Sequence, residues 1–306
     1  MNVREWALPV YTILMQMAVG SLFALWVLRS FAVARFKPGV IDRFIRNPIL
    51  VIIFTAVVAM IAAHFHLSKP FLSYRAVLNF KSSWLSREIV FTTIFFWSLA
   101  GLLYLTFYKA ERRRLISVTG WLAILMGAIL VYCMASIYLL PTQVAWNSGW
   151  VIVSFYVTAM MLGVVALACL MLLDLKFSEI QKAADIKLRV QWIKYSLGSL
   201  TTLVVILVFA SIAITLIQMK LLSMGGVIAQ TSLKLLLDLY FPLLVMRLVL
   251  LISALILLGV AVYRMYRFKL IPQKIFLRVY LSCLLILIGE IIGRFLFYAA
   301  HIRVGL

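Results

Sequence analysis

The side chains best suited to moving protons lie in two places in an otherwise apolar chain. The first is a polar connector, residues 64–88, which holds His64 and His66, two of the three histidines among 306 residues. An imidazole titrates near pH 6.5, so it can accept a proton from a bound ligand at neutral pH. Residues two apart point to different sides of a helix, so at most one of the two rings can face a given pocket. The plainer alternative is a pair of histidines that face water at a helix end.

The second place is a stripe on the last apolar run of the chain. Glu290 is the only one of the nine acids that falls well inside such a run, and a charge at the centre of a bilayer costs at least ~2.5 kcal/mol. Arg294 follows four residues later, so the two side chains share a helix face and can pair. Arg247 and Gln16 lie at a similar depth in other runs. These residues predict a polar pocket inside the membrane; the alternative is an ion-pair network that only fixes helix packing.

The composition places these residues in lipid. The chain is 66% hydrophobic and 12% charged, with a mean hydropathy of +1.13, and a soluble domain cannot bury that much apolar surface. A bilayer core of roughly 30 Å needs about 20 helical residues, so the gaps between charges delimit the spans. They cover approximately residues 7–29, 47–66, 88–108, 115–140, 150–173, 195–219, 239–263 and 277–300. We therefore expect an all-α integral membrane protein, with eight transmembrane helices in a single membrane domain over residues 1–306.

Lysines and arginines are distributed unevenly between the two sides of this expected bundle. The connectors after odd-numbered spans hold 18 of them and the opposite side holds 8. Because short cytoplasmic loops are enriched in these residues, both termini and the 64–88 connector are expected in the periplasm, and the chain in a bacterial inner membrane. The same bias accounts for the net charge of +20 without nucleic acid as a partner. The cations of the connector are a candidate docking surface for a partner, or else a solvated face: Lys69, Arg75, Lys81 and Arg87.

The cysteines do not predict a metal site. Cys133, Cys169 and Cys283 are far apart in apolar runs, without the Cys-x-x-Cys spacing of zinc or iron–sulfur ligands. Haem is disfavoured as well, because the three histidines supply at most one facing pair and no second pair to carry electrons across the membrane. We therefore expect no metal and no covalently bound cofactor in this chain.

Four motifs resemble those of one membrane protein family. Residues 66–70 read His-Leu-Ser-Lys-Pro, similar to the family's His-Leu-Gly-x-Pro, and residues 79–89 resemble its Asn…Ser-x-Leu-Ser-x-Glu. Residues 5–20, with Glu-Trp…Pro…Thr…Gln…Gly, and residues 289–298, with Gly-Glu…Gly-Arg…Phe-Tyr, are similar to its first and last helices. By these motifs the whole chain resembles the membrane anchor subunit of dimethyl sulfoxide reductase (DmsC). It departs from the family at Ser68 and Lys69, where a glycine usually follows the leucine; the histidine is spared.

The resemblance implies a function in anaerobic respiration. Such anchors bind menaquinol near the outer face of the membrane and hold no redox centre of their own. They pass electrons to a ferredoxin-like iron–sulfur subunit and then to a molybdopterin catalytic subunit, both outside, so those cofactors are expected in the partners. By this match His66, not His64, is carried over into the quinol site. The catalytic partner, and not this chain, then selects the terminal electron acceptor.

The expected chemistry is proton removal from a quinol, which loses two electrons and two protons. We expect His66 to accept a proton and Glu290 to act as relay or second acceptor. The expected quinol-binding neighbours, two of which hold the charge of Glu290, are Arg294, Arg247, Gln16 and His64. Two rival functions remain at this point: a small-solute transporter with Glu290 and Arg294 at its site, and a purely structural anchor.

Overall fold

The computed structural model describes residues 3–32, 38–66, 75, 77–178, 183–267, 273–300 and 302. In this part of the chain the regular structure is helical, without a strand. The helices are α1 (Val3–Ala32), α2 (Pro38–Phe44), α3 (Arg46–His66), α4 (Trp84–Tyr108), α5 (Arg113–Ser136), α6 (Gly149–Ser178), α7 (Ala183–Met224), α8 (Val227–Lys234), a π-helical turn (Leu235–Leu239), α9 (Phe241–Arg267) and α10 (Gln273–Ala299). Helices suit this composition because backbone groups in lipid find no water and must bond within their own segment.

Eight of these helices are long and apolar enough to cross a membrane, which confirms the expected number within the described residues. The candidate spans are Trp6–Ala32, Ile41–Phe65, Trp84–Tyr108, Arg113–Ser136, Gly149–Lys176, Leu188–Met224, Phe241–Arg267 and Lys274–Ala299. Each overlaps one of the ranges expected from the gaps between charges.

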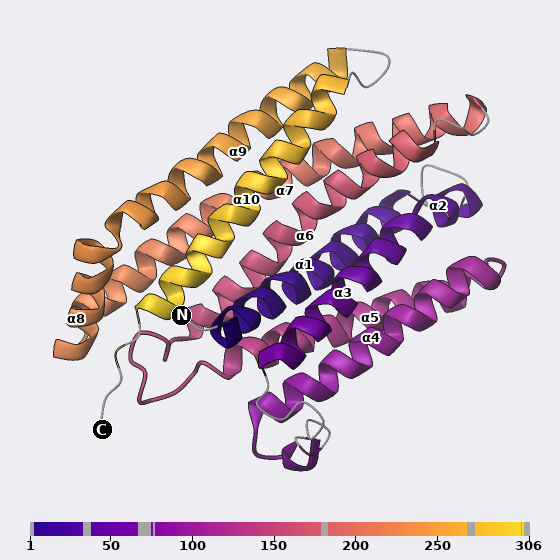
Figure 1. Cartoon of the computed structure of the whole chain (residues 1–306). Helices are drawn as coiled ribbons and strands as arrows, with labels where there is room; N and C mark the ends of the chain where they lie inside the picture. The colour runs from indigo at the N-terminus through magenta and orange to yellow at the C-terminus, as the bar shows by residue number, and fades with distance from the viewer. Residues whose placement is uncertain are drawn as a thin grey trace.

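The eight long helices form two groups of four that meet along α1 and α6 (Figure 1). In one group α1 packs against α3, and α4 against α5; in the other α6 packs against α7, and α9 against α10. Helix α1 also packs closely on α6, and α10 packs on α6 and contacts α1. The start of α1, the end of α10 and α8 lie at one end of the bundle, called the α8 end below, and α2 lies at the other.

The seam between α1 and α6 depends on two glycines. A Cβ on Gly20 would lie 1.9 Å from the carbonyl oxygen of Ala159, and a Cβ on Gly163 would lie 2.1 Å from the carbonyl carbon of Gly20. Small residues allow helix backbones in a membrane to approach this closely. The hydroxyl of Ser21 donates to the carbonyl of Gly163 at 3.1 Å and adds a polar tie to the contact. This contact fixes how far the two helix groups stand apart.

Two local features shape the α8 end. Helix α4 begins at a cap, where the Ser83 hydroxyl accepts a hydrogen bond from the backbone N–H of Ser86 at 3.4 Å, as serine commonly does at helix starts. The segment between α7 and α9 forms α8 and the π-helical turn. It closes a small apolar cluster over the end of α10: Leu222, Ala229, Leu236, Ile292, Leu296 and Ala300.

We predict that Gly163→Ala destabilises the chain by about 1–3 kcal/mol or more, because the new methyl meets backbone atoms that cannot rotate away. The matched control is Gly259→Ala in α9, where an added Cβ meets nothing within 4 Å. Thermal unfolding of the detergent-solubilised protein measures both. Equal melting temperatures for the two variants would show that the seam is not a close contact.

Candidate functional site

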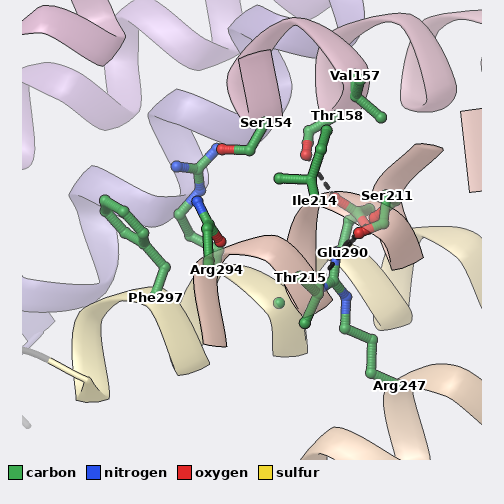
Figure 2. A pocket seen from close by; sticks show the side chains of 12 residues that line it. Ser154, Val157, Thr158, Ser211, Ile214, Thr215, Arg247, Glu290, Arg294 and Phe297 are labelled. Atoms are coloured by element: carbon green, nitrogen blue, oxygen red, sulfur yellow. Dashed lines mark hydrogen bonds and ion pairs between the residues drawn. The ribbon is translucent and has the colours of Figure 1, made fainter. Parts of the chain in front are cut away.

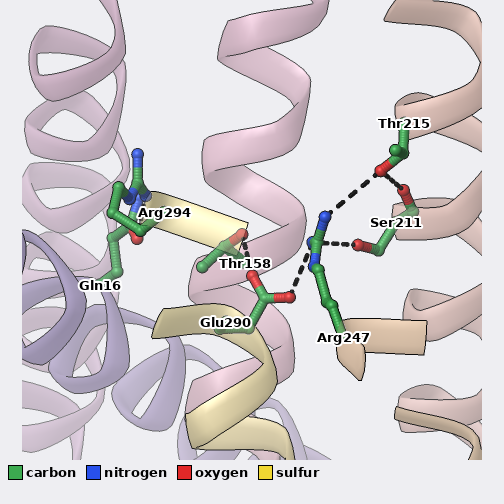
Figure 3. A network of polar contacts seen from close by, with 7 residues as sticks. All are labelled: Gln16, Thr158, Ser211, Thr215, Arg247, Glu290 and Arg294. Atoms are coloured by element: carbon green, nitrogen blue, oxygen red, sulfur yellow. Dashed lines mark hydrogen bonds and ion pairs between the residues drawn. The ribbon is translucent and has the colours of Figure 1, made fainter. Parts of the chain in front are cut away.

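Glu290 is buried in the α8 half of α10 and both of its carboxylate oxygens are occupied (Figure 3). Nη2 of Arg247, on α9, donates to Oε1 at 2.9 Å. The hydroxyl of Thr158, on α6, donates to Oε2 at 2.6 Å. The acid therefore joins three helices of the second group, and its charge has a partner, as a charge inside a membrane requires.

Arg247 reaches Glu290 across a position without a side chain. Nη2 of Arg247 also donates to the hydroxyl of Ser211 at 3.0 Å, and Nη1 donates to that of Thr215 at 3.4 Å, both on α7. A Cβ on Gly293 would lie 2.7 Å from Nε of Arg247, so only glycine leaves room for the guanidinium here. Nε is buried and has no hydrogen-bond partner.

Arg294 does not pair with Glu290, although the spacing of four residues allowed it. Its Nη2 instead donates to the side-chain oxygen of Gln16 on α1 at 2.9 Å, and Nε2 of Gln16 donates to the carbonyl of Phe155 at 3.3 Å. The guanidinium lies 4.1 Å from the centre of the Phe155 ring. Arg294 is only 7% exposed, and no acid of the described residues lies within salt-bridge distance of it. The expected pair is thus replaced by a cation held by an amide and an aromatic ring.

These side chains surround a cavity, shown in Figure 2. The wall includes Ser154 and Thr158 from α6, and Arg247, Glu290 and Arg294 opposite them. The space open to the centres of water molecules is about 60 Å³, room for several waters, because each needs about 10–15 Å³. Of the residues expected at one polar pocket, the structure brings together Glu290, Arg247 and Arg294, with Gln16 bonded to the last.

His64 does not line this cavity. His64 is exposed near the end of α3, and its Nδ1 lies 2.8 Å from the carbonyl of Met60 in the same helix. His66 is the last residue of α3; its side chain lies outside the described residues. Helix α3 packs on α1, α4 and α6, whereas α10 packs mainly on α9 and α6. The expected partnership of His66 with Glu290 stays a prediction, because the side chain of His66 is not among those described.

A second buried acid was not singled out from the sequence. Glu88, five residues after the cap of α4, is 6% exposed, although it stands at the edge of its apolar run. It is hydrogen-bonded to the hydroxyl of Tyr11 on α1, and that hydroxyl also lies 3.0 Å from Oγ1 of Thr92. Helix α3 ends and α4 begins at the same end of the bundle, so Glu88 lies at the end that also carries His66. Its position as the glutamate of the Ser-x-Leu-Ser-x-Glu motif was the available signal.

The expected docking cations differ in their surroundings. Arg75 and Lys81 are exposed, and Lys69 lies outside the described residues. Arg87 is engaged in the connector: Nε donates to the carbonyl of Phe80 at 3.0 Å, Nη2 donates to that of Lys81 at 2.7 Å, and the guanidinium stacks over Trp84. Arg87 therefore orders the connector before α4 as well as carrying charge.

We predict that Arg247→Met destabilises the protein by about 3–5 kcal/mol, because it leaves the Glu290 carboxylate buried without a cation. The double variant Arg247→Met/Glu290→Gln removes both charges and is expected to recover most of that loss. Thermal unfolding in detergent measures each, with Arg267→Met, an exposed arginine of the same helix, as control. A double variant as unstable as the single one would contradict the pairing.

Comparison with known proteins agrees with the architecture. The model of the family "DMSO reductase anchor subunit (DmsC)" matches residues 1–300. The anaerobic dimethyl sulfoxide reductase chain YnfH of Escherichia coli K12 is 26% identical over 306 residues, 99% of this chain and 97% of its own length. An anaerobic dimethyl sulfoxide reductase chain of Haemophilus influenzae Rd is 27% identical over 310 residues, 100% of this chain and 99% of its own. A sulfite dehydrogenase subunit of Allochromatium vinosum is 34% identical over 79 residues, 26% of this chain and 24% of its own. With eight apolar helices and a match along nearly its full length, this chain is a multi-pass membrane protein that belongs to the DMSO reductase anchor subunit family.

Proposed function

We propose that this chain is the membrane anchor and menaquinol-oxidising subunit of a molybdoenzyme complex in anaerobic respiration. In this proposal it lies in the bacterial inner membrane with the α8 end and both termini in the periplasm. Electrons pass to a ferredoxin-like iron–sulfur partner, which docks over Lys69, Arg75, Lys81 and Arg87 and feeds a molybdopterin catalytic subunit. The anchor role rests on family membership, and the quinol chemistry rests on the position of Glu88 and of the end of α3.

The observation that carries the proposal is the buried Glu88 near the start of α4, a helix that packs on α3. Menaquinol is a neutral diphenol that dissolves in lipid, so it can enter between helices at this depth. Its oxidation to the quinone releases two electrons and two protons, and each proton needs an acceptor. His66, carried over from the family motif, takes one in this proposal. Glu88, held by Tyr11 at 6% exposure, is better placed than Glu290 for the other, because α4 packs on α3 and α10 does not pack closely on it.

The position of the acceptors sets the direction of proton release. His66 ends α3 and Glu88 lies in the second turn of α4, both at the α8 end. With that end in the periplasm, protons and electrons leave on the same side, so quinol oxidation here builds little or no membrane potential. The terminal acceptor is selected by the catalytic partner.

The two rival functions have different standing. A solute transporter built on Glu290 and Arg294 has less support, since those residues do not pair and each is bonded to another helix. A purely structural anchor is compatible with the Glu290–Arg247 ion pair, and a quinol measurement separates it from the proposal.

We predict that Glu88→Gln and His66→Asn each lower menaquinol-dependent turnover of the intact complex about 100-fold or more, the usual contribution of a proton acceptor. Activity with a viologen donor, which bypasses the membrane subunit, should stay within about twofold of wild type and shows that the complex is assembled. His64→Asn is the matched control, because His64 is exposed and bonded to its own helix. Full quinol-dependent turnover in both test variants would leave the chain as an anchor without quinol chemistry.

A further inference from the structure

The cavity at Arg294 and Glu290 is left without a role once the protons are assigned to His66 and Glu88. It lies in the second helix group, walled by α6, α7, α9 and α10, whereas Tyr11 and Glu88 lie between α1 and α4. On α1, Gln16 follows Tyr11 by five residues, which places the two side chains about 140° apart around the helix. Helix α1 therefore separates two polar sites, one on each side.

The cavity holds a buried cation with unused hydrogen-bond donors. A guanidinium has five N–H donors, and Arg294, at 7% exposure, uses one of them on Gln16 among the described residues. The charged acceptor of the cavity is already engaged, because both oxygens of Glu290 receive a hydrogen bond. The charged groups of the cavity therefore favour a ligand that accepts hydrogen bonds.

The depth of the cavity narrows the ligand class. Arg294 is five residues from the end of α10, and Arg247 is six residues from the start of α9, or about 8–9 Å along each helix axis. Both helices have 27 residues, about 40 Å, and extend past a hydrocarbon core of roughly 30 Å, so the cavity lies just inside the edge of that core. A neutral ring that dissolves in the hydrocarbon reaches it directly.

The cavity also continues into apolar space. Two further cavities, of about 40 and 90 Å³, share Thr215 and Arg247 with it. The smaller lies between α7 and α9 and is walled by Met219, Leu244 and Leu216, the last 61% exposed on the outer side of α7. An isoprenoid tail can lie in this space and pass between α7 and α9 to the bilayer.

We propose that this cavity is a second site, which binds the oxidised ring of an isoprenoid quinone. The two carbonyls of a quinone only accept hydrogen bonds, so the free N–H donors of Arg294 suit the ring, and the tail occupies the apolar space beside Met219. The ring fills the cavity and moves Gln218, which lines both the polar and the larger apolar space. The site binds without redox chemistry and lies apart from the quinol-oxidation site.

The test counts bound quinone on the purified intact complex, with a photoreactive azido-naphthoquinone that carries a short isoprenoid tail. Wild type is expected to bind two equivalents per anchor subunit and to label peptides of both helix groups. Arg294→Met should lose one equivalent and the label on α9 and α10, whereas Arg267→Met should keep both. Glu88→Gln should lose the other equivalent. Viologen-driven activity checks that each variant is assembled.

The outcomes separate this proposal from the proposed function. A single equivalent that Glu88→Gln removes and Arg294→Met leaves unchanged overturns the second site. Retention of both equivalents and of full turnover in Glu88→Gln overturns the quinol assignment and leaves the second site standing. If Arg294→Met fails to assemble, Met219→Trp replaces it: it fills the tail space and should weaken binding of a long-tailed quinone at α9 and α10 at least tenfold, with short-tailed binding unchanged. Equal affinity for both tails in that variant also overturns the proposal.

Discussion

The contact between α1 and α6 at Gly20 and Gly163 is the constraint on which the rest of the structure depends. It brings two backbones so close that no side chain fits between them, and it makes α1 the shared wall of both helix groups. Because α1 is held there, Gln16 donates a hydrogen bond to the carbonyl of Phe155 and accepts one from Arg294. The same placement turns Tyr11 toward Thr92 and Glu88 on the opposite side. Both polar sites are thus positioned by a contact between two residues that have no side chain.

The buried charges of this chain are of two kinds. Toward the α2 end, Arg29 pairs with Asp42 at 2.8 Å and Arg189 pairs with Asp174, so each acid has its own cation. Toward the α8 end the pairing is incomplete: Glu290 takes Arg247, whereas Arg294 lies against an amide and a ring and the buried Glu88 is bonded to Tyr11. A buried cation without a counter-ion is costly inside lipid, and a matched pair would have fixed the helix packing with less unfavourable energy. This asymmetry is the physical reason to assign the α8 half a ligand and the α2 half a structural role.

The helices could be predicted from the sequence because the bilayer imposes them: a charge-free run of about 20 residues has few other structures available. The depth shared by Gln16, Arg247, Glu290 and Arg294 was predictable for the same reason. The hydrogen-bond partners of these residues could not be predicted, because helix spacing shows which side chains share a face but not which neighbouring helix lies closer. Glu290 pairs with Arg247 of α9, which passes over Gly293, and not with Arg294 of its own helix. Glu88 was overlooked because an acid at the edge of an apolar run looks solvated until α1 is seen to cover it.

An added methyl group at Gly293 would have an electrostatic effect as well as a steric one. At most helix contacts an added methyl group crowds an apolar neighbour, and the cost is steric. Here the nearest atom to such a methyl is a guanidinium nitrogen, so relief of the crowding displaces the cation that neutralises Glu290. Replacing Gly293 with alanine would therefore act as an electrostatic change. It would alter no ionisable residue of the sequence and yet separate Glu290, the acid that lines the described cavity, from its counter-ion.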